Sequence, residues 1–131
     1  MTKRINAIKA LTPSIKLQNT AQNDLLCKYI SRRSSLNTGE INNVLTQLHE
    51  AILFFIRAGH PVKLDKLGTF TPTIRLDGSY NLNVRIDRAL IREMNRPGEM
   101  EAEILNHKNI GLSADDLIAQ WNDLHPVDQV A

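Results

Sequence analysis

The chain lacks several features that place proteins in well-known classes. It has one cysteine, Cys27, among 131 residues, so it cannot form an internal disulfide. No apolar run is long enough to span a bilayer, and the basic N-terminus lacks the continuous apolar core of a signal peptide. These absences predict a protein of the reducing cytoplasm with no membrane partner.

Aromatic residues are also scarce, at 5% of the chain against 42% for apolar residues as a whole. Aliphatic side chains must therefore dominate any core. At this length we expect one domain, or one domain with an appendage.

Patterns typical of catalysis and metal binding are missing as well. No histidine stands at metal-ligand spacing from a cysteine or a second histidine, no serine lies in a nucleophile elbow, and no glycine-rich loop could hold a phosphate. We therefore predict a protein that is not an enzyme and needs no metal, cofactor or small-molecule substrate. The histidines are His49, His60, His107 and His125.

The net charge of +2 conceals an uneven distribution. Residues 1–96 hold 15 of the 16 Lys and Arg residues but only 7 of the 14 Asp and Glu residues. Residues 97–131 hold one lysine and seven acidic residues. Small domains vary this much by chance, but a basic body with an acidic end also indicates a polyanionic partner, or a charge match within or between chains.

Residues 37–58 carry the clearest helix signals. Asn37 is a good N-cap, and Glu40 at the third helical position can complete a capping box. Gly59 supplies a left-handed stop, and Pro61 prevents the helix from restarting. Between these ends, apolar residues recur with helical spacing on one face: Ile41, Val44, Leu45, Leu48, Ala51, Ile52, Phe55 and Ile56.

Leu53 and Phe54 fall on the far side of that helix. Either the rest of this chain or a second copy covers them, and a helix that is apolar on two sides in so small a domain favours the second copy. The residues expected at a homodimer interface are Leu48, Ile52, Leu53, Phe54, Phe55 and Phe70.

Three further helices are predicted around the central one. Residues 20–34 form a helix that joins it in a tight αα-hairpin, residues 87–95 form a short helix, and Ser113 caps another that ends at residue 124. Residues 1–19 read as short extended pieces around Thr12-Pro13, on the pattern of Ile5, Ala7, Ile15 and Leu17. Residues 99–106 fit either a helix or a strand, and the flanking glycines favour a strand.

After Gly59 the apolar spacing changes to two, which indicates strands. Val62 and Leu64 begin the first strand, and Gly68 marks a bend or bulge. A β-hairpin follows, and a three-residue loop, Asp77-Gly78-Ser79, gathers its apolar residues on one face. This register pairs Leu76 with Tyr80, Ile74 with Leu82 and Phe70 with Ile86, and it places Thr73, Arg75, Asn81, Asn83 and Arg85 on the opposite face.

Several of these segments together resemble the HU/IHF superfamily, and more closely the HU-like proteins of Bacteroidetes-type bacteria. The resemblance rests on Ser34-Ser35-Leu36, Gly39-Glu40, Ala58-Gly59-His60-Pro61-Val62, Leu67-Gly68-Thr69-Phe70, and the tail from Asn109-Ile110-Gly111 to His125-Pro126. It implies an α+β dimer in which helical hairpins form the base and three-stranded sheets form a DNA saddle with long β-arms. It also implies an N-terminal extension at 1–19, an HU-like core at 20–96, and an acidic C-terminal extension at 97–131 that packs on or beside the core.

The resemblance implies a nucleoid-associated, architectural protein that binds the backbone of duplex DNA. The candidate DNA contacts are the cations on and beside the predicted sheet: Arg75, Arg85, Lys63, Lys66, Arg88 and Arg92. The family's long basic arm carries a proline that wedges between base pairs, whereas this hairpin is short, turns at Asp77-Gly78 and has Pro72 near its base. Weakened bending is therefore expected. The alternatives are an HU-like fold that serves protein assembly and has lost DNA binding, and an acidic end that inhibits the basic face.

Overall fold

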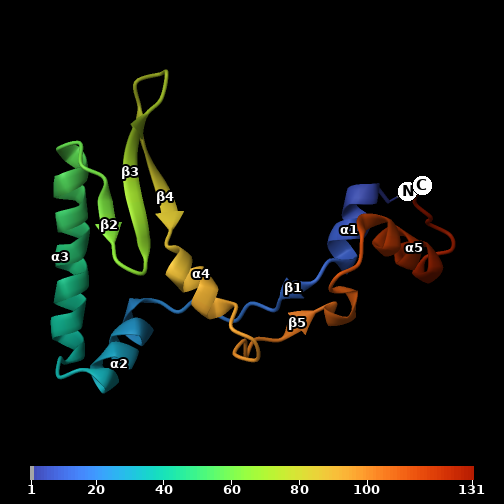
Figure 1. Cartoon of the computed structure of the whole chain (residues 1–131), viewed down its shortest axis with the longest axis horizontal. Coiled ribbons are helices and arrows are strands. Elements are labelled where there is room, and N and C mark those ends of the chain that lie inside the picture. The colour runs from blue at the N-terminus through green and yellow to red at the C-terminus, as the bar shows by residue number, and fades with distance from the viewer. Residues whose placement is uncertain (1) are drawn as a thin grey trace. The chain divides into compact units, whose positions relative to one another are not determined.

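The computed structural model describes residues 2–131, which divide into two compact units (Figure 1). The central unit is Asn19–Met100. The terminal unit combines the two ends of the chain, Met1–Gln18 and Glu101–Ala131. Both units mix helices with small antiparallel sheets, so the chain belongs to the α+β class.

The central unit begins with two helices, α2 (Asn23–Arg33) and α3 (Thr38–Arg57), which pack as the predicted αα-hairpin. Asn37 is the N-cap of α3, and its side-chain oxygen accepts from the Glu40 backbone N–H at 2.8 Å. The Glu40 carboxylate accepts from the Asn37 side-chain amide at 2.7 Å, rather than from the backbone N–H that a capping box would use. Gly59 takes φ +89° and ends the helix as predicted.

A three-stranded antiparallel sheet follows, in the order β2 (Val62–Leu64), β3 (Gly68–Ile74), β4 (Tyr80–Ile86). Of the bend or bulge predicted at Gly68, the bulge is wrong, because both ladders run through this residue in regular register. Glycine is needed there for another reason. A Cβ at position 68 would lie 2.6 Å from the Arg85 carbonyl oxygen, so the close approach of β4 excludes any side chain.

The hairpin has a three-residue loop as predicted, but the loop lies one residue earlier, at Leu76-Asp77-Gly78. The Arg75 N–H donates to the Ser79 carbonyl at 2.9 Å and closes the loop. Gly78 occupies the last loop position with φ +87°, a left-handed conformation that Ser79 would have had to adopt in the predicted register. The predicted pairs are therefore wrong by two residues, and the observed pairs are Ile74 with Tyr80, Pro72 with Leu82, Phe70 with Val84 and Gly68 with Ile86. A shift of two keeps every side chain on its predicted face.

The last element of the central unit is the short helix α4 (Arg88–Met94), within the predicted range 87–95. Asp87 caps it by accepting from the Ala89 N–H at 2.8 Å. The Asp87 N–H donates to the Leu67 carbonyl at 2.9 Å, which ties the start of α4 to the turn between β2 and β3.

The terminal unit contains α1 (Arg4–Leu11), β1 (Ser14–Ile15), β5 (Ile104–Leu105), the 3-10 helix η1 (His107–Asn109) and α5 (Ala114–Leu124). The extended structure predicted around Ile5 and Ala7 is wrong, because both residues lie in α1 and Ala7 is buried. The strand favoured for 99–106 is confirmed over two residues. There Ile104 pairs with Ile15, and Leu105 pairs with Ser14.

Side-chain amides hold α1 to the C-terminal segment. Asn109, which is 2% exposed, donates to the Leu11 carbonyl at 2.7 Å, and Asn106 donates to the Ala10 carbonyl at 2.9 Å. These bonds satisfy carbonyls at the C-terminal end of α1 that have no partner within the helix. Ser113 caps α5 as predicted, here with a full capping box to Asp116.

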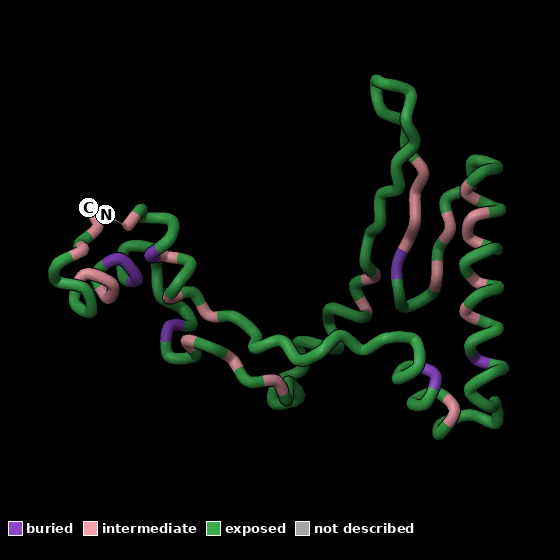
Figure 2. Tube along the Cα trace, turned by 180° about the vertical axis from the view of Figure 1, so that it is seen from behind, coloured by how far each residue is buried: buried purple, intermediate pink, exposed green. Residues whose placement is uncertain are grey.

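Few side chains are fully buried in either unit (Figure 2). Ala7, Leu117 and Ile118 form the core of the terminal unit, and Cys27 and Ile41 are the buried apolar side chains of the central one. Within residues 2–131, no helix combines the length and the apolar character needed to cross a membrane.

Candidate nucleic-acid interface

The sheet of the central unit has one apolar and one polar face. Residues that pair across an antiparallel sheet share a face. The apolar face therefore carries Val62, Leu64, Phe70, Pro72, Ile74, Tyr80, Leu82, Val84 and Ile86, and the polar face carries Lys63, Thr69, Thr71, Thr73, Asn81, Asn83 and Arg85. We call the second set the polar face.

The polar face has cations at both of its ends. Lys63, Thr69 and Arg85 form one row across all three strands. Arg75 lies at the other end, beside the hairpin loop, where it pairs with Ser79. At about 3.4 Å per residue, the six residues from Thr69 to Arg75 place these two ends roughly 20 Å apart.

The other three predicted contacts lie at or beyond the base of the sheet. Lys66 stands in the turn between β2 and β3 with φ +68°. Arg88 opens α4 directly after Asp87, whose bond to Leu67 brings it to the same turn. Arg92 lies one helical turn further along α4. The structure thus groups Lys63, Lys66, Arg85 and Arg88 near one end of the sheet and leaves Arg75 alone at the other.

Among residues 2–131, none of these six cations takes part in an ion pair. Their charge is therefore available to an external anion. Asp77 carries the opposite charge at the hairpin tip, two residues from Arg75. Hydrogen bonds from the Ser79 hydroxyl and the Ser79 backbone N–H lower the pKa of Asp77, so this carboxylate stays ionised near neutral pH.

An open groove of about 1160 Å³ lies between the apolar face and α3. Ile52, Leu53 and Ile56 line it from the helix, and Phe70, Tyr80 and Leu82 line it from the sheet. Leu53, predicted to lie on the far side of the helix, lines this groove and also a second pocket along α3. Leu48, Ile52, Leu53 and Phe70 of the predicted interface are half-buried, whereas Phe54 and Phe55 are exposed.

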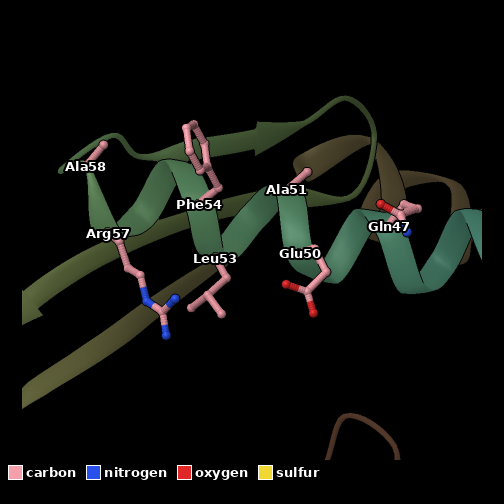
Figure 3. Close-up of a pocket in the computed structure, with 7 residues that line it drawn as sticks. All are labelled: Gln47, Glu50, Ala51, Leu53, Phe54, Arg57 and Ala58. Carbon is pink, nitrogen blue, oxygen red and sulfur yellow. The ribbon is translucent and has the colours of Figure 1, made fainter.

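A second, shallower pocket lies along α3, between Gln47 and Ala58 (Figure 3). Leu53 and Arg57 point to one side of the helix in this view, and Phe54 points to the other. The Phe54 ring is 69% exposed and touches only the edge of Phe55 among the aromatic side chains described, with ring centroids 5.3 Å apart. The helix is therefore apolar on two sides, as its sequence predicted.

The motif Asn81-Leu82-Asn83 was recognised from sequence only as part of a strand face. The alternation of Asn with apolar residues predicted the face on which the two asparagines lie, and the observed pairs Thr73–Asn81 and Thr71–Asn83 place them there. Within residues 2–131, the structure also holds no cluster of His, Cys, Asp and Glu side chains that could bind a metal ion.

One family model matches this chain, and it is described as the HU-HIG family, an HU domain fused to a wHTH, Ig or glycine-rich motif. The match covers residues 3–96, well over half of the chain. The chain belongs to the HU-HIG family. The HU-HIG match spans the whole sheet, α2, α3 and α4 and also includes α1 and β1, so it reaches into the terminal unit. No curated protein and no solved structure matches the chain.

Proposed function

We propose that this HU-HIG chain is a non-enzymatic, HU-like protein of the Bacteroidetes type, which acts as a cytoplasmic homodimer on nucleoid DNA. It binds duplex DNA through the backbone, with the polar face as the docking surface. The observation that carries the proposal is a set of six cations on and beside the sheet of an HU domain, none of which forms an ion pair within residues 2–131.

Electrostatics supplies the affinity. Each Lys or Arg that meets a phosphate releases condensed counterions, and the gain depends on salt but not on sequence. Lys63 and Arg85 share one row, and Lys66 and Arg88 lie beside it, so four positive charges can follow one stretch of phosphates. Arg75 reaches phosphates roughly 20 Å away, or about six base-pair steps of 3.4 Å.

The hairpin supports only weak bending. Its loop is Leu76-Asp77-Gly78, where the carboxylate of Asp77 repels phosphates. Pro72 lies within β3, pairs with Leu82 and lines the groove, so it cannot act as a wedge at the tip. A short ribbon with a negative tip neutralises fewer phosphates than a long basic arm, and less binding energy remains to deform the duplex.

A second copy of the chain is proposed to pack against the groove and against Phe54. Most of the groove is lined by aliphatic and aromatic residues, with His49, Arg57, Thr73 and Asn81 among the others. An open, largely apolar surface of this kind marks a protein interface. A two-fold dimer uses the same patch on both copies, so Leu53 and Phe54 of one α3 can meet the groove of the other. Lys63, Lys66, Arg85 and Arg88 lie outside the lining of the groove, so this arrangement leaves them free for DNA.

One alternative function has a specific observation in its favour. The middle of the polar face is neutral, whereas the largely apolar groove calls for a partner whether or not DNA binds. An HU-like assembly module without DNA binding would show this combination. It predicts a stable dimer and no salt-dependent affinity for duplex DNA.

Inhibition of the basic face by the acidic end has less support. Within the terminal unit, Asp115 lies 2.5 Å from the Arg4 guanidinium, and Glu103 lies 3.5 Å from the Lys16 ammonium. The uneven charge distribution allowed either a polyanionic partner or a charge match within or between chains. These two ion pairs favour a charge match within the terminal unit.

Fluorescence anisotropy with a labelled duplex tests the proposed function on the full chain. We compare the wild type with Lys63→Ala/Arg85→Ala and with Lys9→Ala/Lys108→Ala, which removes the same charge from the terminal unit. If both cations meet phosphates, the slope of log affinity against log salt falls in the first variant by about 1.8 for each copy that contacts the duplex, or about 3.6 if both copies of the dimer do. The control variant keeps the wild-type slope.

Two outcomes would count against the proposal in different ways. Absence of wild-type binding at low salt, in a chain that light scattering shows to be dimeric, would favour the assembly module. Equal loss of slope in both double variants would mean that net charge, rather than the polar face, attracts the DNA.

A further inference from the structure

Residues 127–131 belong to the terminal unit but form neither a helix nor a strand. We call this segment the strap. Asp128 and Val130 are half-buried, whereas the three other residues of the strap are exposed. Every second residue therefore faces the unit, which is how an extended peptide lies on a surface that binds it.

Two neighbouring residues of α5 hold the main chain of the strap. The Trp121 indole N–H donates to the Asp128 carbonyl at 2.9 Å. The Asn122 side-chain amide donates to the Val130 carbonyl at 2.9 Å, and its oxygen accepts from the Val130 N–H at 2.6 Å. Asn122 thus bonds both main-chain groups of one residue, as the opposite residue of an antiparallel strand would.

The N-terminal segment makes the contacts that select the sequence of the strap. The Thr2 backbone N–H donates to the Asp128 carboxylate at 2.8 Å, and the Thr2 hydroxyl donates to the second oxygen of that carboxylate. The Arg4 guanidinium donates to the Ala131 carbonyl at 3.2 Å. Two residues after the carboxylate, Val130 buries part of an aliphatic side chain. The site therefore fits an extended Asp-x-Val segment.

The strap is separable from the rest of the terminal unit. None of its residues belongs to the buried core, and the bond from Asn109 to Leu11 holds α1 without it. The strap can therefore detach while α1 and α5 stay packed, because segments with few buried contacts open at little cost in free energy. The four side chains that hold the strap would then form an open site for an Asp-x-Val peptide.

We propose that this site binds the strap of a second copy, so that two copies exchange straps and become linked through their terminal units. The inference rests on the homodimer of the proposed function and adds a second contact to it. The sequence that occupies the site is that of residues 128–131, and every copy of the chain carries it. Exchange keeps each hydrogen bond and changes only the backbone at His125-Pro126-Val127, so this form of domain swapping costs little free energy.

Proximity decides where exchange occurs. The short connection to α5 holds a strap near its own site at an effective concentration of about a millimolar. A free second copy at micromolar concentration cannot compete with it. Within a homodimer, however, the strap of the other copy is tethered as well. Exchange is therefore expected within the dimer and not between free copies.

Paired cysteines can trap both arrangements in the full chain. The Thr2 and Asp128 side chains are in direct contact, as the residues of a disulfide must be, so we introduce Thr2→Cys/Asp128→Cys with Cys27→Ala. The bonds from Trp121 and Asn122 to the strap remain. In a glutathione buffer, a strap on its own chain gives an internally bridged monomer on a denaturing gel, whereas an exchanged strap gives a covalent dimer. We expect the two products in roughly equal amounts.

Two further variants show whether the covalent dimer reports exchange. Adding Ile52→Asp should break the homodimer. At about 10 µM it should lower the yield of covalent dimer about 100-fold, the ratio of that concentration to an effective concentration of about 1 mM. Thr2→Cys/Gln129→Cys with Cys27→Ala is the matched control, because Gln129 is an exposed residue of the strap, and it should form little of either product.

Three outcomes would overturn the inference. Internally bridged monomer alone, in a chain that light scattering shows to be dimeric, would mean that each strap stays on its own chain, and it would leave the homodimer intact. Equal yields of covalent dimer from the Gln129 control would mean that the disulfides form by random contact. A chain that is monomeric at high concentration would remove the proposed homodimer and exchange with it.

Discussion

The two units of this protein differ in how they bury their apolar side chains. The terminal unit closes on itself: its core of Ala7, Leu117 and Ile118 is surrounded by side-chain bonds between its two segments, such as Asn109 to Leu11. The central unit is larger but buries only Cys27 and Ile41 among its apolar side chains, and it leaves a groove open along α3. The terminal unit thus buries a core within its own two segments, whereas the central unit leaves much of its apolar surface exposed.

A charge in the groove should have the largest effect of the changes predicted here, because it acts on both the oligomeric state and the unfolding temperature. Ile52→Asp places a carboxylate where the second copy is proposed to pack, and burying it unpaired costs about 3 kcal/mol or more. We expect a monomer by light scattering and a lower unfolding temperature. Asn43→Asp adds the same charge to an exposed position of α3 and should leave both values unchanged. A wild type that is monomeric at high concentration would refute the proposed interface.

Gly68→Ala should damage the central unit alone. The added methyl group would lie 2.6 Å from the Arg85 carbonyl, so β3 and β4 must separate, at a cost of about 1–3 kcal/mol. Hydrogen exchange measured by peptide should show faster exchange in β3 and β4 and no change in α5. Gly39→Ala is the matched control, since alanine fits the first turn of α3 and should be neutral or stabilising. Unchanged exchange in the Gly68 variant would refute the steric argument.

Asn109→Ala should destabilise the terminal unit and leave the central unit unchanged. The Leu11 carbonyl loses its partner inside the terminal unit, which costs about 1–3 kcal/mol. The chain's single tryptophan, Trp121, lies in α5 and donates to the Asp128 carbonyl at 2.9 Å, so its fluorescence reports on this unit. We expect the fluorescence transition to move to lower denaturant while exchange in β3 and β4 stays the same. A shift in both units would show that they unfold together.

Acid should weaken the terminal unit through Asp128, with the smallest effect of the four. Hydrogen bonds from the Thr2 hydroxyl and backbone N–H hold the pKa of Asp128 below its ordinary value of 3.8. The unfolded chain therefore binds this proton more tightly, so the stabilisation is complete above pH 3.8 and is lost as the pH falls through the lower folded-state pKa.

Asp128→Asn removes this titration. Its Trp121 fluorescence should depend less on pH in the acid range than that of the wild type, and at neutral pH the variant should be slightly less stable. Identical acid profiles for the two proteins would show that the contact between Thr2 and Asp128 does not stabilise the fold.

Local signals in the sequence predicted the helices of the central unit well. Asn37 caps α3 and Gly59 ends it as predicted, because a cap or a left-handed stop depends on a few neighbouring residues. The two strand faces were also predictable, since alternation places every second residue on the same side. The candidate cations could thus be assigned to the sheet and its base, together with the neutral polar residues that share a face with Arg75 and Arg85.

Features that depend on distant residues were not predictable from these signals. The register of the hairpin differs by two residues because Gly78, rather than Ser79, takes the left-handed position. The helix α1 was missed because its strongest support comes from partners about 100 residues away, such as Asn109 and Asn106. The apolar spacing within residues 1–19 gives no information about partners so distant in the sequence.

The discontinuity of the terminal unit sets an order of events during synthesis. The contacts of the central unit lie within Asn19–Met100, so it can begin to fold while the rest of the chain is still being made. The N-terminal segment must wait, because Thr2 meets Asp128 only after 126 further residues have been added. Closing so long a loop is slow relative to local pairing. We therefore expect α1 to remain without its partners until the ribosome has released α5, which makes the terminal unit the last part of the molecule to form.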